Sequence, residues 1–226
     1  MIDLLQRQPR YIMEIDRLKS FSDNIFGFAM TLLIAQIIVP QVSQNMVTTQ
    51  LPGLLLHQWR YFAIYAISFL NIGGYWVLHH TLFAHLQGTD KTLIWLNLLL
   101  LLTVTFLPYP TALMGKYGRD TVTASVYGIS ITLTYGMLNI VCAYACSEAR
   151  FLKPNIDPHL RRMFQLRLLV PLIIAAIGTM LSFFYFRLSF LVYFLVAVFN
   201  SIPMPIWANQ LAKLPGNKSF KHPKAT

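Results

Sequence analysis

A single carboxylate lies near the start of the first long apolar run of the chain. This residue is Asp23, in the segment RLKSFSD at residues 17–23. An ionisable side chain inside a membrane span costs about 2.5 to 3.5 kcal/mol even on lenient insertion scales, so it needs a partner or a function. One interpretation is a carboxylate at the N-terminal end of a helix, where the helix dipole favours negative charge. The other is a buried link to donor groups on neighbouring helices.

Two later apolar runs contain suitable donor groups. The second run ends with Trp76, His79 and His80, and the third run has Asn97 near its start. If both termini are cytoplasmic, as the basic residues indicate, these side chains lie at a depth similar to that of Asp23. We therefore predict a polar network that joins three helices near the inner leaflet. Its role would be mainly architectural, with control of opening as a second role.

The polar residues of the sequence form no catalytic or metal-binding pattern. The His79–His80 pair is only one histidine box, and a di-iron centre needs several. Cys142 and Cys146 share a helix face one turn apart, but further metal ligands are not nearby in the sequence. No Ser/His/Asp set, glycine-rich phosphate loop or pair of carboxylates occurs within one apolar region. We expect neither an enzyme nor a bound metal or other cofactor.

The elements that carry these residues are predicted to be membrane helices. The chain has 226 residues, of which 56% are hydrophobic and only 12% charged, about half of the usual charged fraction. A soluble core of this size could not bury so many apolar side chains, whereas a bilayer could. Each span needs about 20 apolar residues. We predict an all-α membrane protein, with residues 1–226 as a single domain of six transmembrane helices at about 21–40, 61–83, 93–114, 122–146, 168–186 and 188–211.

The basic residues that produce the net charge of +10 are interpreted as topology signals rather than as a nucleic-acid-binding patch. Cytoplasmic loops carry an excess of Lys and Arg. Only Arg60, Lys116, Arg119 and Arg187 fall on one side of the predicted spans. The other 14 place both termini in the cytoplasm, which requires an even number of spans. These 14 are Arg7, Arg10, Arg17, Lys19, Lys91, Arg150, Lys153, Arg161, Arg162, Arg167, Lys213, Lys218, Lys221 and Lys224.

The first predicted helix has one apolar side. At 100° per residue, Phe28, Thr31, Leu32, Ala35 and Val39 share a side that also includes Phe21 and Asn24. Asp23 points about 140° away from Phe28 on the same helical projection. One side of the helix could therefore face a pore or partner while the other anchors the carboxylate. Ordinary packing or lipid contact is the alternative for such a stripe.

The same residues form a recognisable signature. Arg17, Phe21, Ser22 and Asp23 form the pattern R-x-x-x-F-S-D, which resembles the opening of the first helix in the transmembrane protein 175 family of endosomal and lysosomal potassium channels and their prokaryotic relatives. The resemblance is strongest over residues 17–111 and covers the first three predicted helices. It continues in TLL at 31–33, YW at 75–76, HH at 79–80, Phe83, NLL at 97–99 and FLPYPT at 106–111.

The resemblance implies a fold and a function. Single-repeat prokaryotic members form homotetramers, and the first helix of each subunit lines the pore without a ring of carbonyls. The implied constriction begins at Phe28 and continues at Thr31 or Leu32 and at Ala35. Relatives usually have Ile or Leu in place of Phe28, and Leu or Ile in place of Ala35. Both differences would alter where the pore is narrowest.

We therefore expect a homotetrameric channel in the cell membrane that favours potassium, with a hydrophobic gate that closes by dewetting. The permeant potassium ion, the lipid bilayer and three further copies of the chain would be its partners. A proton-coupled secondary transporter or a proton-conducting channel is the alternative, because Asp23 and the histidines are groups that can relay protons. A non-conducting scaffold is a third hypothesis.

Overall fold

The computed structural model describes residues 14–118, 120–147, 151–153 and 158–202, with the side chains of residues 158–163 excepted. Helices make up almost all of this part of the chain, which confirms the predicted all-helical class. The extended pairing in the described residues is an isolated antiparallel bridge between Leu86 and Leu152. The helices are α1 (Ile15–Ala35), the 3-10 helix η1 (Gln44–Met46), α2 (Val47–His57), α3 (Trp59–Ala84), α4 (Lys91–Phe106), α5 (Pro108–Tyr117), α6 (Thr121–Ser147), α7 (Pro158–Ser182) and α8 (Phe186–Ser201).

Four segments within the described residues are long and apolar enough to cross a membrane. They are α3, α4 together with α5, α6, and the part of α7 from Phe164 to Ser182. Helix α8 is apolar but shorter, with 16 residues. Helix α1 has 21 residues, about the length of a span, but Ser22, Asp23 and Asn24 lower its hydropathy. The chain is thus a multi-pass membrane protein.

Several helix boundaries differ from those expected from the apolar runs. Helix α1 begins at Ile15 rather than at Phe21 and ends at Ala35 rather than at Pro40. The third run contains two helices, because the backbone of Pro108 has no N–H to donate and Pro108 starts α5 instead. Residues 203–211, the last part of the sixth predicted span, lie outside the described residues.

Residues 158–167 were expected in a loop before the fifth span, but they form the first part of a helix. Helix α7 already begins at Pro158, so Arg167 lies within this helix, and only 3% of its surface is exposed. Its Nη2 atom donates to the backbone oxygens of Asn200 at 3.2 Å and Ile202 at 2.7 Å. Its guanidinium also lies 4.4 Å from the ring centre of Phe199. The cation therefore satisfies carbonyl groups at the C-terminal end of α8, where the helix dipole favours positive charge.

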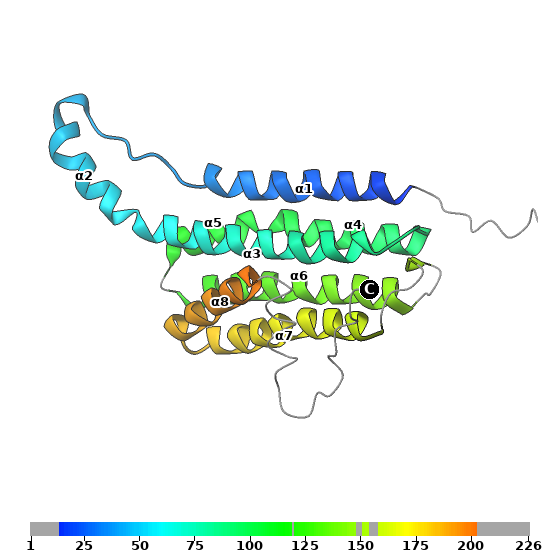
Figure 1. Ribbon diagram of the computed structural model, residues 1–226. Coiled ribbons are helices and arrows are strands. Elements are labelled where there is room, and N and C mark those ends of the chain that lie inside the picture. Colours follow the sequence, from blue (N-terminus) through cyan, green and yellow to red (C-terminus); the bar gives the residue numbers. More distant parts are fainter. Residues whose placement is uncertain (1–13, 119, 148–150, 154–157, 203–226) are drawn as a thin grey trace, which may run out of the picture.

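The helices run side by side, with α1 along one edge of the bundle and α7 along the other (Figure 1). Helix α1 packs against α3, α4 and α5, whereas α7 packs against α6 and α8. Between these two edges, α3, α4 and α6 contribute most of the core. In Figure 1, α2 stands away from the bundle, beyond the end of α1. Helix α1 is therefore peripheral within one subunit, with one side packed and one side free.

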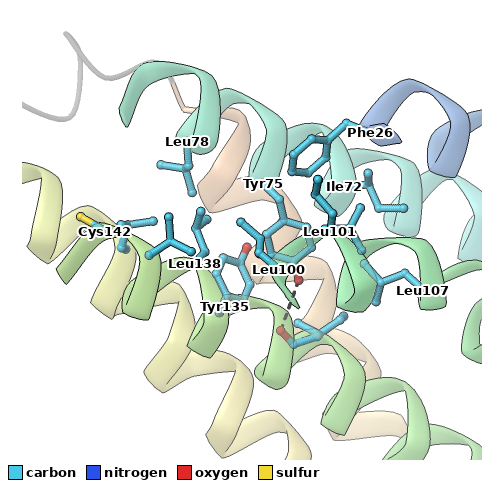
Figure 2. Packing of buried hydrophobic residues seen from close by; sticks show 14 of the residues in the cluster. Phe26, Ile72, Tyr75, Leu78, Leu100, Leu101, Leu107, Tyr135, Leu138 and Cys142 are labelled. Atoms are coloured by element: carbon cyan, nitrogen blue, oxygen red, sulfur yellow. Dashed lines mark hydrogen bonds between the residues drawn. The ribbon is translucent and has the colours of Figure 1, made fainter. Parts of the chain in front are cut away.

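Aromatic and aliphatic side chains fill the centre of the bundle (Figure 2). The rings of Tyr75 on α3 and Tyr135 on α6 meet edge to face with their centres 4.5 Å apart, a favoured geometry for aromatic pairs. The hydroxyl of Tyr75 donates to the backbone oxygen of Ile131 at 3.4 Å. Phe26 extends from α1 into the same cluster. This apolar contact is one of those that hold α1 in place.

Candidate functional site

Helix α1 has two chemically distinct sides. Its packed side consists of Leu18, Ser22, Phe26, Ala29 and Leu33, which are all buried. These positions recur every three or four residues and therefore share one face of a helix. The opposite side is open. This packing fixes the rotation of α1 about its own axis.

The open side carries the stripe that the sequence singled out. Phe28 is 58% exposed. Leu32 is half-buried at the margin of the stripe. The remaining members are exposed, namely Phe21, Asn24, Thr31 and Ala35. Within the part of the chain that the structure describes, Phe28, Thr31 and Ala35 thus lie on one accessible face of α1, with Leu32 at its margin.

A hydrogen-bonded chain of side chains crosses from α1 to α4 and then to α3. The Ser22 hydroxyl donates to the backbone oxygen of Leu18 at 2.8 Å and accepts from Nδ2 of Asn97 at 2.9 Å. Oδ1 of Asn97 lies 2.8 Å from Nε2 of His79. All three side chains are buried. Because the amide oxygen of Asn97 can only accept, Nε2 is the nitrogen of His79 that carries the hydrogen.

The His79 ring is held between two phenylalanines. It stacks on Phe83 with ring centres 4.0 Å apart and lies 5.4 Å from the ring of Phe26. Its Nδ1 atom is buried and lacks a hydrogen-bond partner among the described residues.

The Asp23 carboxylate belongs to a second, separate contact. Oδ1 of Asp23 accepts a hydrogen bond of 2.8 Å from Nε1 of Trp76 on α3. The ring of Trp76 lies 5.5 Å from the ring of His80, which is exposed. Asp23 is half-buried rather than buried. It therefore reaches α3 through an indole donor and not through the histidines or Asn97.

The structure thus divides the expected network into two parts. Ser22, Asn97 and His79 form the buried part, and Asp23 with Trp76 forms the part nearer the surface. Sequence reasoning had assigned Ser22 only to the signature, without a partner. A signal for its role was present, because Ser22 falls on the same helix face as the apolar Leu18, Phe26 and Ala29. Arg17 is exposed on the open side, in the first turns of α1.

Another buried polar cluster lies between α3, α5 and α6 and was missed from the sequence. Thr111 Oγ1 donates to Ser68 Oγ at 2.9 Å, and Ser68 Oγ lies 2.9 Å from the hydroxyl of Tyr127. Each residue is an isolated polar group in its own apolar run, so no pattern connects them in the sequence. Their effect is to tie the helices that support α1. The described residues contain no group of three or more His, Cys, Asp or Glu that could hold a metal ion.

The known proteins that this chain resembles are ion channels. A family model described as "Endosomal/lysosomal potassium channel TMEM175" matches residues 17–108. A potassium channel of Streptomyces collinus is 31% identical over 203 residues, which cover 85% of this chain and 95% of that protein. A potassium channel of Chamaesiphon minutus is 37% identical over 150 residues, 65% of this chain and 73% of that protein.

Two further comparisons extend this picture. The rat protein named "Endosomal/lysosomal proton channel TMEM175" is 24% identical over 83% of this chain, which corresponds to 38% of the rat protein. The crystal structure of a lysosomal potassium-selective channel TMEM175 homologue from Chamaesiphon minutus superposes on this chain with a TM-score of 0.73 at 31% identity. The superposed region covers 82% of this chain and 95% of the chain in that structure.

Proposed function

The chain belongs to the TMEM175 family of ion channels, and on that premise we propose that it forms a homotetrameric cation channel that favours potassium. Because the family consists of channels, the chain is not an enzyme, and no cofactor is implied. The proposal includes six transmembrane helices per subunit, with α1 as the first and α8 as the start of the last. Four copies of α1 surround a common axis and line the pore.

The observation that carries this proposal is the division of α1 into a packed side and an open side. Hydrogen bonds between membrane helices fix which side of a helix faces its neighbours, and α1 has two such contacts. They hold Ser22 and Asp23 toward α3 and α4. Phe28, Thr31 and Ala35 are thereby directed away from the rest of the subunit, where three further copies can meet them.

Phe28 forms the hydrophobic constriction of this proposed pore. Four phenylalanine side chains at one level make a narrow apolar constriction from which water withdraws. An ion would have to lose its hydration shell to enter this section, so the dewetted constriction blocks it. Ala35 lies two turns further along, about 10 Å from Phe28 at 1.5 Å per residue. Its small side chain leaves a wider section there, so the barrier is concentrated at Phe28 and the adjacent Thr31 and Leu32.

Thr31 supplies the polar contribution to ion preference. Its hydroxyl donates to the backbone oxygen of Phe28 at 2.8 Å. The hydrogen is therefore directed to the helix, and the lone pairs of the oxygen are available to a cation on the open side. Four such oxygens partly replace the water around a potassium ion. Selectivity built in this way is modest, because the ring surrounds the ion at only one level.

The proposed orientation places both termini in the cytoplasm. Arg167 no longer counts toward this assignment, since it is buried in α7. The remaining 13 basic residues of the cytoplasmic set still outnumber the four on the opposite side. The start of α1, the end of α3 and the start of α4 then share the inner leaflet, where the polar anchors lie.

Ion flux into liposomes that contain the purified protein tests the proposal. Potassium, sodium and proton gradients are imposed one at a time, and rubidium uptake reports the potassium pathway. We expect uptake that exceeds the sodium flux and a particle of four subunits in the same preparation. A monomeric particle, or liposomes that remain impermeable to rubidium, would contradict the channel.

A proton pathway is the second candidate, and one observation favours it. His79 lies in the subunit core, its Nδ1 atom has no hydrogen-bond partner among the described residues, and the rat relative is named a proton channel. The His79→Gln variant retains a donor for Asn97 but cannot exchange protons near neutral pH. If protons pass through this ring, proton flux falls in the variant while rubidium flux persists. An unchanged proton flux would reject this route.

A further inference from the structure

The connection between α1 and α3 is an arm without any buried residue. We define the arm as residues 36–58, which include η1 and α2. From Ile34 to Ala63, every residue is exposed or half-buried. Figure 1 shows α2 and the loop before it beyond the end of α1, away from the other helices. Within its own subunit the arm packs against the start of α3.

The arm has a defined backbone despite this exposure. The side-chain amide of Gln58 donates to the backbone oxygen of Ile38 at 2.8 Å, which closes the base of the arm. Helix α2 contains Pro52 and Gly53 within its 11 residues. An isolated helix of this length is marginally stable in water, and proline and glycine inside it weaken it further. Such a helix needs a surface against which to pack.

Several large apolar side chains of the arm are exposed. Ile38, Val39 and Leu56 are 77%, 79% and 75% exposed, and Leu54 and Leu55 are also exposed. Contiguous apolar patches of this kind mark a protein or membrane contact. The two occupants to compare are therefore lipid and a neighbouring protein.

The charge pattern favours a second copy of the chain over lipid. Asp, Glu, Lys and Arg are absent between Asp23 and Arg60, although the whole chain carries 18 basic and 8 acidic residues. Helices that lie on a bilayer are rich in Lys and Arg on their polar face, and α2 has neither. Around a symmetry axis, by contrast, every charge would meet its own copies at short range. An uncharged surface suits contact between identical subunits.

The arm follows directly on the end of the proposed pore helix α1. Ala35 of the open side is exposed at this end, and Ile38 and Val39 are exposed shortly after it. We propose that the arm of each subunit docks on the adjacent subunit, against the end of its α1 and its arm. The four arms then form a collar that holds the pore helices together on the side opposite the cytoplasm. This inference rests on the proposed function.

Site-specific photocrosslinking tests the collar in the full-length protein in liposomes. The photoreactive residue p-benzoylphenylalanine is incorporated at position 56, in the arm. Position 180 serves as the control, because Met180 is 70% exposed on α7, at the opposite edge of the bundle. Illumination at position 56 is expected to give products at two to four times the chain mass, at least fivefold more abundant than at position 180 at equal labelling.

The outcomes separate the collar from the channel. Adducts of position 56 with lipid alone, in a tetramer that conducts rubidium, would overturn the collar and leave the channel intact. A particle that is monomeric before illumination would overturn both. As a second measurement, Leu56→Lys brings four like charges together and is expected to lower the tetramer fraction at least tenfold, whereas Met180→Lys is not. Equal tetramer fractions in the two variants would contradict the collar.

Discussion

The side-chain amide of Asn97 donates a hydrogen bond of 2.9 Å to the hydroxyl of Ser22, and this contact joins α4 to α1 within the core. It fixes one side of α1 by a polar contact rather than by apolar packing alone. In a membrane, where apolar surfaces gain little by exchanging lipid for protein, such a bond determines helix orientation more than it determines total stability. The open side of α1 follows from it.

The first prediction concerns the strength of this contact. A double-mutant cycle with Ser22→Ala and Asn97→Ala should give a coupling free energy of about 0.6 kcal/mol, and at most about 1.7 kcal/mol, the range measured for polar contacts between membrane helices. Thermal unfolding in detergent provides the measurement. Ser22→Ala combined with Ser125→Ala is the control, since Ser125 bonds to Ser182 and not to Ser22. A coupling near zero for the first pair would show that the bond is not formed.

The second prediction concerns the constriction. Phe28→Ala removes the ring that narrows the proposed pore and should raise rubidium flux at least several-fold, because the dewetted section becomes wider. Phe194→Ala makes the same chemical change at an exposed site on α8, away from α1, and should leave flux near that of the unmodified protein. Equal flux in both variants would remove Phe28 from the pore.

Ion preference is the subject of the third prediction. Thr31→Val keeps the shape of the side chain but removes its oxygen, and the ratio of potassium to sodium flux should fall about two- to fivefold. That range corresponds to about 0.5 to 1 kcal/mol, the usual net contribution of one polar contact. Thr105→Val is a matched control, because Thr105 is half-buried on α4 and its hydroxyl also bonds to the carbonyl three residues earlier. A ratio that changes equally in both variants would argue against a role for Thr31.

Much of this arrangement could be predicted from the sequence, but the choice of partners could not. The spacing of Phe28, Thr31 and Ala35 places them on one side of a helix whatever surrounds it. Ser22 and Asp23 differ by 100° around α1, and only the packing of α1 on α3 and α4 decides which of them meets Asn97. Arg167 was assigned to a loop because a buried cation needs partners, and its carbonyl partners, Asn200 and Ile202, lie more than 30 residues away in the sequence. Helix α2 lacks a periodic pattern and contains Pro52 and Gly53, so no helix was expected there.

The fourth prediction tests the role of Arg167 at the end of α8. Arg167→Leu removes charged donors from the backbone oxygens of Asn200 and Ile202, and leaving buried acceptors without them costs about 1 to 3 kcal/mol. Arg187→Leu deletes an exposed guanidinium and should change stability by less than about 0.5 kcal/mol. The midpoint of thermal unfolding distinguishes the two. A loss that is no larger in Arg167→Leu would mean that the end of α8 is held by other contacts.

The last prediction uses two glycines of α6 that differ only in their surroundings. A methyl group added at Gly128 would lie 2.7 Å from Oγ1 of Thr179 and would also overlap the hydroxyl of Tyr193. Helices α7 and α8 would therefore have to move away from α6. Gly128→Ala should therefore destabilise the fold by about 1 to 3 kcal/mol, as overpacking does in other cores. At Gly136 an added methyl group meets nothing within 4 Å, and Gly136→Ala should stabilise the helix by up to about 1 kcal/mol. The two variants thus have opposite signs in the same thermal unfolding assay. Only a small residue at position 128 lets α6 approach α7 and α8 as closely as in this structure. If both variants were stabilised, the three helices would not be packed this closely.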